Sequence, residues 1–516
     1  MDTFAWLLAI LAGSVAITAL ARRIGAPYPA LLAVAGAALA LAPFAPHIAI
    51  APDLALALFV APILVDSGYD TSLRDLKSNW APVAGLVFVA VGLTTAAVAW
   101  TAHALVPGLP WAAAIALGAI VAPPDAAAAT SVLRQLKPPH RLMVILEGEG
   151  LLNDVTALLI FRFAVTAVAA GGFSLMQAGP TFVVIAIGSI VLGYVLGRLA
   201  PAVLGRIQHP PSAIVMQFVS AYGVWILAER LHLSAILTVV VFAMVTAQRA
   251  PQRTPARLRL PAYAVWDTAV FLVNVLAFAL IGFQVRPIFE RLSAEEARDY
   301  GLVALAVLAV VIGVRIAWAL SFNAALRVKN HFFGVSMPRP MLAPTFRSGV
   351  IISWSGMRGV VTVAAALSLP QGFPHRDLIQ VVAFAVVLGT LLIQGLTLRP
   401  LMAAFRLSDD TVEREASKAR KIAVKAALQL LEGRGGSAVD ALRHEYSELL
   451  KEARETDPGE GIDTDLDALR RETVAVQRRT IVEMRSSGEI GDDAFHLIEA
   501  ELDLVEVSAS GRGVAE

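Results

Sequence analysis

The sequence of 516 residues contains no cysteine, so disulfide bonds, thiolate chemistry and Cys-ligated metals are excluded. Charge is also scarce, because Asp, Glu, Lys and Arg together make up 16% of the chain. Of the 41 acidic residues, only 16 fall within the first 408 positions. No GxxxxGK[ST] sequence is present, so a Walker-type nucleotide site is not expected.

Apolar residues are abundant instead, at 57% of the chain with a mean hydropathy of +0.68. A membrane-spanning helix needs about 20 mainly apolar residues. Thirteen such stretches occur, all before Leu407, centred near residues 12, 37, 60, 91, 121, 154, 190, 220, 240, 272, 312, 357 and 390. They are continuous rather than alternating, which favours helices over a barrel. The sequence predicts an all-α polytopic membrane protein with about 13 transmembrane helices.

The orientation of these spans follows from the basic residues in the short loops, since Lys and Arg gather on the cytoplasmic side. The odd-numbered loops carry most of them: Arg22, Arg23, Arg74, Lys77, Arg134, Lys137, Arg141, Arg206, Arg249, Arg253, Arg257, Arg259, Arg327, Lys329 and Arg339. We expect the N-terminus outside and the C-terminus in the cytoplasm. The first span lacks a basic n-region and a cleavage site, which indicates a retained helix.

The chain changes character after Arg406, where charge becomes dense. Between Asp409 and Glu516 lie 25 of the 41 acidic residues, interleaved with Lys and Arg in helical patterns. We predict a transmembrane domain over residues 1–407 and a cytosolic, charged helical tail over 408–516. The tail is either a solvated appendage or a regulatory or dimer-supporting domain.

Few acidic residues lie at membrane depth. They are Asp66, Asp125, Asp154 and either Glu147 or Glu149. An ionisable group there costs several kcal/mol unless it is paired or hydrated, so it marks a pathway for ions or protons. The alternative for any one of them is a salt bridge that only holds helices together.

The sixth span contains EGEGLLND at residues 147–154. Glu149 and Asn153 are four residues apart and share a helix face, whereas Asp154 is turned about 100° further. Asp154 lies near the middle of the span. Glu147 lies about 10 Å closer to the cytoplasm, where water can reach it, and is the weaker candidate.

The fifth span contains APPDAAAAT at residues 122–130. Pro123 and Pro124 remove two backbone donors, so the helix is expected to break near Val121 and Ala122 and to restart with Asp125 in its first turn. Freed carbonyls in mid-membrane are tolerated where they line a site. A simple proline kink is the alternative.

The twelfth span contains SGMRGVV at residues 355–361 and is predicted to be interrupted as well. Spans 5 and 12 are seven apart, so they enter the bilayer in opposite directions, as in secondary transporters built from inverted repeats. Arg358 stays charged and needs a carboxylate. We predict Glu149 as its partner, which leaves Asp154 free to titrate. Arg162 and Arg315, nearer to span ends, are interpreted as structural.

Together these segments resemble the sodium/proton antiporters of the NhaP-like and NHE-type family along essentially the whole chain. EGEGLLND is similar to the family's EGESLLND, and further likeness lies in APPDAAAAT, NVLAFALIGFQV (274–285), SGMRGVVTVAAALSLP (355–370) and SSGEIGDDAFHLIEAELDL (486–504). The resemblance implies an NhaA-like fold of inverted six-helix repeats, with dimerisation and core subdomains, in a homodimer embedded in the lipid of the bacterial inner (plasma) membrane.

The resemblance also implies roles for individual residues. Asp154 would bind Na⁺ or the proton, supported by Asn153, with Asp66 as a further Na⁺ ligand and Asp125 as part of the ion and proton site. Glu149 and Arg358 would form a buried ion pair. The Asn-Asp pair goes with electroneutral one-for-one exchange. The substrates would be Na⁺ or Li⁺ and H⁺, with no cofactor, no nucleic acid and no enzymatic reaction.

The chain departs from the family at two places. Gly150 replaces the usual serine, and Pro124-Asp125-Ala126 replaces the usual Thr-Asp-Pro, which leaves the choice among Na⁺, Li⁺ and K⁺ open. A K⁺/H⁺ antiporter on the same fold is therefore an alternative. An intramembrane hydrolase with Asp125 and Asp154 as an acid/base dyad is a remote one, because Arg358 and two broken helices serve no dyad.

Overall fold

The structure is a computed structural model. It describes residues 2–42, 56–136, 138–169, 175–249, 254–284, 286, 290, 292–333, 345–405, 411–455, 465–487, 498–499 and 501–504. Every regular element in these ranges is a helix, which confirms the predicted all-α class. The chain forms two compact units, Met1–Leu407 and Ser408–Glu516.

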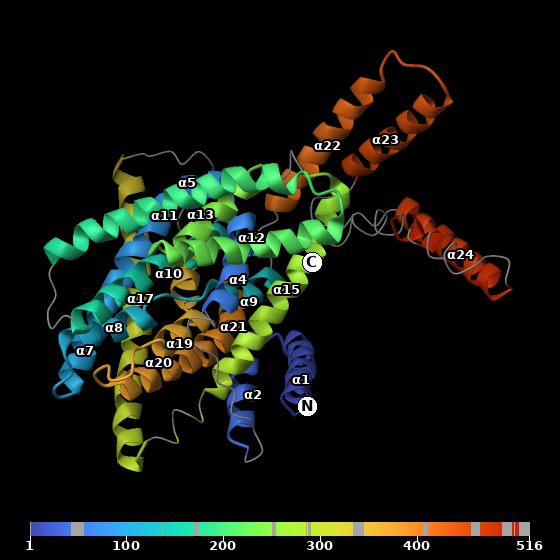
Figure 1. Cartoon of the computed structure of the whole chain (residues 1–516). Helices are drawn as coiled ribbons and strands as arrows, with labels where there is room; N and C mark the ends of the chain where they lie inside the picture. The colour runs from blue at the N-terminus through green and yellow to red at the C-terminus, as the bar shows by residue number, and fades with distance from the viewer. Residues whose placement is uncertain are drawn as a thin grey trace. The chain divides into compact units, whose positions relative to one another are not determined.

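The first unit contains the apolar helices (Figure 1). Its elements are α1 (Asp2–Ile24), α2 (Tyr28–Ala40), η1 (Leu56–Val60), α4 (Ala61–Asp70), α5 (Leu73–Ser78), α6 (Trp80–Ala84), η2 (Gly85–Ala90), α7 (Val91–Leu105), α8 (Trp111–Val121), α9 (Ala126–Leu133), η3 (Arg134–Leu136), α10 (His140–Ala169), α11 (Leu175–Leu204), α12 (Pro210–Arg230), α13 (Ala235–Ala247), α15 (Ala256–Phe283), α17 (Ala294–Phe333), α18 (Phe346–Trp354), α19 (Val360–Leu367), α20 (Arg376–Thr390), η5 (Leu391–Gly395) and α21 (Leu396–Phe405).

Each of the thirteen predicted apolar stretches coincides with one of these helices or with a consecutive group of them. Within the described ranges, 8 helical segments are long and apolar enough to cross a membrane. The shorter helices α2 and α13 are apolar as well. A multi-pass membrane architecture is thus confirmed, while the number of thirteen crossings stays a prediction.

Two predicted spans are interrupted in their middle. In span 5, α8 ends at Val121 and α9 begins at Ala126. In span 12, α18 ends at Trp354 and α19 begins at Val360. Both interruptions fall where the proline pair and the glycine-rich sequence predict them.

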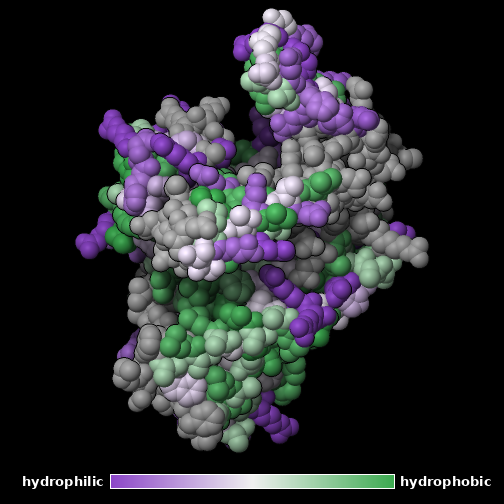
Figure 2. Space-filling model, turned by 90° about the vertical axis from the view of Figure 1, so that its right-hand side faces the viewer, coloured by the Kyte–Doolittle hydropathy of each residue, from purple (hydrophilic) through white to green (hydrophobic). Residues whose placement is uncertain are grey.

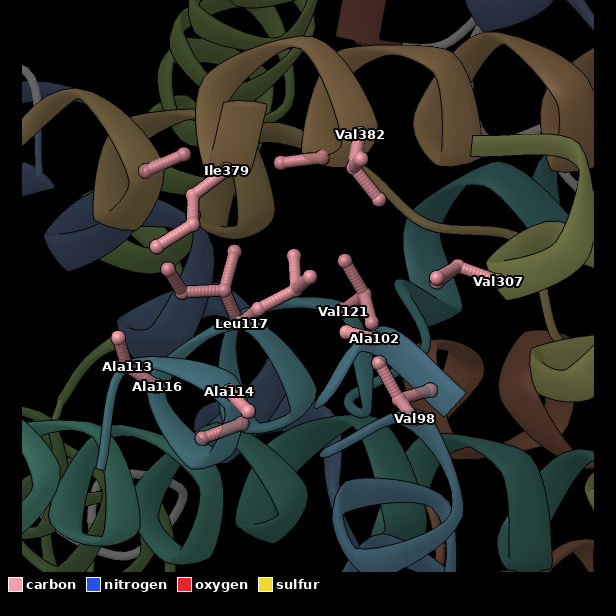
Figure 3. Packing of buried hydrophobic residues seen from close by; sticks show 14 of the residues in the cluster. Val98, Ala102, Ala113, Ala114, Ala116, Leu117, Val121, Val307, Ile379 and Val382 are labelled. Atoms are coloured by element: carbon pink, nitrogen blue, oxygen red, sulfur yellow. The ribbon is translucent and has the colours of Figure 1, made fainter. Parts of the chain in front are cut away.

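A large cluster of buried hydrophobic side chains surrounds α8 (Figure 3). Small residues on α8, among them Ala113 and Ala116, allow close packing, and Leu117 lies toward Ile379 of α20. Val98 of α7 contributes to the same cluster. In Trp111–Leu133, which contains α8 and α9, 72% of the most apolar stretch is buried inside the structure. In Val183–Leu204 of α11, the buried share is 17%. The broken span 5 is therefore central, and α11 is peripheral.

Parts of the outer surface of the first unit are apolar, as lipid contact requires. Large hydrophobic side chains are exposed along α11 and α12, for example Val184, Ile187, Val191, Val215 and Val219. Figure 2 shows hydrophobic residues gathered over a broad part of one face. Exposed apolar area of this kind marks contact with a membrane or with another protein.

The second unit consists of charged helices. Helices α22 (Thr411–Leu431) and α23 (Ser437–Glu455) follow each other, and α24 (Asp465–Ser486) comes next. Val474 and Ile481 of α24 form a small apolar cluster with Leu502. Arg478 of the same helix binds Asp503 at 2.6 Å. The helical character that we predict for this part is therefore observed in its described residues.

Candidate functional site

The two interrupted spans touch each other at their breaks. The backbone N–H of Asp125, which directly precedes α9, donates to the carbonyl of Met357 at 2.6 Å. Pro123 and Pro124 stop α8 because they supply no N–H and hinder the helical turn before them. Two unwound backbone segments from distant parts of the sequence thus meet inside the helix bundle.

Arg358 of the unwound segment closes the end of α8. Its Nε donates to the carbonyl of Val121 at 3.0 Å and its Nη2 to that of Ala122 at 3.1 Å, while Nη1 donates to Gly356. The residue is fully enclosed, and its backbone N–H donates to Thr390 Oγ1 at 3.0 Å. A helix C-terminus carries partial negative charge. The guanidinium therefore satisfies the carbonyls that the break exposes.

Asp125 provides the opposite charge at two helix N-termini. Its Oδ1 accepts from Ala127 N at 2.9 Å, and the N–H groups of Ala128 and Val360 also point at the carboxylate. A side chain at Gly359 would place its Cβ 1.7 Å from Asp125 Oδ2, so only glycine fits there. A carboxylate is favourable at the positive end of a helix. Asp125 is therefore the N-cap of α9, and its carboxylate lies against Gly359 at the N-terminus of α19.

The buried partner of Glu149 is Arg315 of α17, so the predicted Glu149–Arg358 pair is wrong. Two parallel hydrogen bonds join them, from Nη1 to Oε1 at 2.5 Å and from Nη2 to Oε2 at 2.8 Å. Only 3% and 2% of the two side chains are exposed. Arg358 is instead engaged by the carbonyls at the end of α8. The two-pronged geometry of Arg315 matches a carboxylate and makes this pair strong.

Asn153 and Asp154 lie in the middle of α10, beside the break in span 5. Asn153 Nδ2 donates to the carbonyl of Pro124 at 2.7 Å, and its Oδ1 is buried without a partner among the described residues. The Asp154 carboxylate has no hydrogen-bond or ion-pair partner in the described part of the chain, and the residue is 9% exposed. Its charged neighbour is Asp125. Asn153 Oδ1 and the Asp154 carboxylate, on adjacent residues, thus both lack a partner within the described ranges.

Gly150 brings α10 close to the first residue of α9. A Cβ at position 150 would lie 2.3 Å from the Cβ of Ala126. The two positions at which the sequence departs from the family pattern are therefore direct neighbours. The missing hydroxyl at position 150 is accompanied by tighter helix contact, because neither residue carries a side chain beyond Cβ.

Asp66 of α4 belongs to a different group of charges. Its charged neighbours are Asp70, Asp267 and Arg134, and Asp154 is not among them in the described part of the chain. Arg134 also binds Glu147 at 3.2 Å, and both side chains are partly exposed. The structure thus groups Asp66 with these charges, and its role as an ion ligand stays a prediction.

No group of three or more His, Asp or Glu side chains with metal-binding geometry occurs in the ranges that the structure describes. Arg315 makes a structural pair, in line with its interpretation from the sequence, but its partner Glu149 and the contact of Thr390 with Arg358 were not predicted. The signal for Arg315 was its place inside an apolar run, VVIGVRIAWAL, where an unpaired cation would be costly. No such signal marked Thr390, because a threonine hydroxyl can donate its hydrogen bond to a carbonyl of its own helix.

Comparison with known proteins decides the family. The family model described as "sodium/hydrogen exchanger, transmembrane" matches residues 8–404. The chain belongs to this family. A protein named an uncharacterized Na⁺/H⁺ exchanger from Mycobacterium tuberculosis is 33% identical over 97% of this chain and 95% of its own length. The resemblance seen in the sequence is thereby confirmed.

More distant members agree. A protein of Bacillus subtilis named a sodium, potassium, lithium and rubidium/H⁺ antiporter is 28% identical, over 93% of this chain and 74% of its own. The solved structure of the sodium proton antiporter MjNhaP1 from Methanocaldococcus jannaschii at pH 8 has a TM-score of 0.58 at 18% identity. The match covers 79% of this chain and 97% of the archaeal chain, which confirms the antiporter fold.

Proposed function

We propose that this exchanger family member moves Na⁺ or Li⁺ in exchange for H⁺, one for one, with both ions competing for Asp154. The observation that carries the proposal is the enclosed Asp154 carboxylate, which no described residue neutralises, beside the free Oδ1 of Asn153. A carboxylate in such surroundings gains from binding a proton or a hard cation. The same oxygen atoms accept one or the other, but not both.

The balance of charge around the crossing supports a one-for-one exchange. Arg315 and Arg358 contribute two positive charges, while Glu149 and Asp125 contribute two negative ones. The group is therefore neutral when Asp154 is protonated and carries one negative charge when it is not. One monovalent cation restores neutrality. Moving a neutral group through the bilayer costs less than moving a charged one, which favours the two loaded forms.

The unwound segments support a mechanism of alternating access. They place irregular backbone at membrane depth, where it is tolerated only around a cavity or a site. In transporters of this architecture one bundle moves against the other around the fixed site. Asp154 would then face the cytoplasm when it takes up Na⁺ and the outside when it takes up H⁺, so a proton gradient drives sodium export.

We place the protein in the plasma membrane as a homodimer, with its N-terminus outside. The orientation rests on basic residues in the predicted cytoplasmic loops, such as Arg134 and Arg141. The exposed apolar side chains on α11 and α12 can contact both lipid and a second copy of the chain. Asp66 is proposed as a ligand that the cation meets on its way to Asp154, because it lies among partly exposed charges.

Exchange of K⁺ for H⁺ is the second candidate. It is favoured by the printed name of the Bacillus subtilis relative, which includes potassium and rubidium among its cations. Family membership supports a transporter rather than an enzyme. The intramembrane hydrolase is disfavoured because Asp125 is held by backbone N–H groups of two helices.

The test is a cation pulse given to proteoliposomes that contain the purified protein and a pH-sensitive dye. Na⁺, Li⁺ and K⁺ are added in turn, with protein-free vesicles as the control. We expect a change in lumenal pH with Na⁺ and Li⁺. A response to K⁺ alone would replace the first candidate by the second, and silence with all three cations would refute exchange.

A further inference from the structure

Gln394 is a buried amide without partners. It lies in the π-helical segment η5, is 0% exposed, and neither its Oε1 nor its Nε2 has a hydrogen-bond partner among the described residues. Leaving a buried polar group unsatisfied costs about 1–3 kcal/mol. Buried groups of this kind require an explanation, since most are paired. An apolar side chain of similar size would avoid the cost entirely.

The surroundings of Gln394 are those of the break in span 12. Four residues earlier, Thr390 Oγ1 accepts the N–H of Arg358 at 3.0 Å. One residue later, a Cβ at Gly395 would lie 3.2 Å from Met357 Sδ. Residues on both sides of Gln394 therefore contact the unwound segment 355–359. Gln394 therefore belongs to the part of the bundle that borders the unwound backbone of span 12.

The helix itself is distorted at this place. Residues Leu391–Gly395 form a π-helical turn between α20 and α21. Such turns are rare and frequently occur at functional sites. A wider turn leaves backbone and side chains room to change register. Both the distortion and the unpaired amide thus fall on the same short segment.

We propose that Gln394 is a positioning residue of the exchange cycle, whose amide binds peptide groups of segment 355–359 when that segment shifts between the two access states. An amide offers an acceptor and two donors, which matches the C=O and N–H of an unwound peptide. Gln394 stabilises the conformation in which these bonds form and lowers the barrier to reaching it. The inference rests on the proposed exchange function.

A second buried glutamine provides the comparison. Gln380 of α20 is also buried, and its Nε2 donates to the carbonyl of Ala366 at 3.4 Å. This amide already has its partner within the fold. A substitution at Gln380 therefore removes a hydrogen bond of the resting structure, whereas one at Gln394 removes none.

The experiment measures exchange in proteoliposomes and melting temperature in detergent for the wild type, Gln394→Met and Gln380→Met. For Gln394→Met we expect turnover to fall about tenfold, because the hydrogen bonds of the shifted state are lost. Its half-saturating Na⁺ concentration should stay at the wild-type value, and its melting temperature should rise, because the substitution removes an unsatisfied buried amide. Gln380→Met should keep turnover and lose thermal stability.

Two results would overturn the proposal. Wild-type turnover in Gln394→Met would show that the amide has no part in the cycle. A sharp fall in its melting temperature would show that the amide is already paired in the resting fold. Silence of the wild-type protein in the same vesicles would instead overturn the proposed function, so the two failures are distinguishable.

Discussion

At the scale of single residues, the site contains charged groups that have a fixed partner and one carboxylate that no described residue neutralises. Arg315 holds Glu149 through two hydrogen bonds, and Arg358 holds the carbonyls at the end of α8. Asp154 has no such partner in the described part of the chain. The fixed pairs hold the helices together, whereas the unpaired Asp154 carboxylate is available to bind a proton or a cation in turn.

Replacing Asp154 by Asn is the direct test of that separation. The change keeps the shape of the side chain but removes the charge that proton and cation share, so exchange should vanish while the melting temperature is retained. Flux in proteoliposomes and thermal melting in detergent measure the two effects. Asp377→Asn, at an exposed site on α20, is the matched control and should remain active. An active Asp154→Asn would place the ion site elsewhere.

The buried pair makes a second prediction. Removing one partner strands the other charge and typically costs about 3–5 kcal/mol. Glu149→Gln and Arg315→Met should therefore each lower the melting temperature sharply, and the double variant should lose less than the sum of the two. The same cycle with Arg358→Met should show weaker coupling to Glu149, because its guanidinium is held by carbonyls. Equal coupling energies in the two cycles would refute the assignment of Arg315 as the partner of Glu149.

At the scale of elements, the sequence predicts the helices and their breaks well. The proline pair at 123–124 and the glycine-rich stretch around Gly356 act locally, so their effect can be inferred without knowing the fold. The partner of Glu149 could not be inferred in this way. Arg315 and Arg358 are both long cations in apolar runs, and only the packing of α17 against α18 places Arg315 opposite the carboxylate. The separation of Glu149 from either arginine along the sequence does not show which of the two is its partner.

The contact between α10 and α9 leads to the third prediction. Gly150→Ser introduces atoms where Ala126 already lies, and overpacking of this kind costs about 1–3 kcal/mol. Thermal stability should fall, and adding Ala126→Gly should restore part of it. Gly223→Ser on α12 is the matched control, since nothing lies within 4 Å of a Cβ at that position. Equal losses in the two serine variants would mean that the helix contact does not set the effect.

At the scale of the whole molecule, one-for-one exchange means that the transmembrane unit carries no net charge across the bilayer in either loaded form. The fourth prediction follows from this. An imposed membrane potential, set with valinomycin and a K⁺ gradient, should leave the rate of Na⁺/H⁺ exchange unchanged. Acceleration by the potential would indicate a second titrating acid, with Asp125 or Asp66 as the first to substitute.

The central claim is that one carboxylate serves both ions, and the dependence of Na⁺ affinity on pH tests it most directly. We would measure the half-saturating Na⁺ concentration of the wild-type protein in proteoliposomes over a range of pH. If one proton replaces one cation at Asp154, this concentration rises by about tenfold for each unit that pH falls on the acidic side, and it levels off on the alkaline side. A half-saturating concentration that stays constant while the maximal rate changes would contradict the account, because proton and cation would then bind at separate sites.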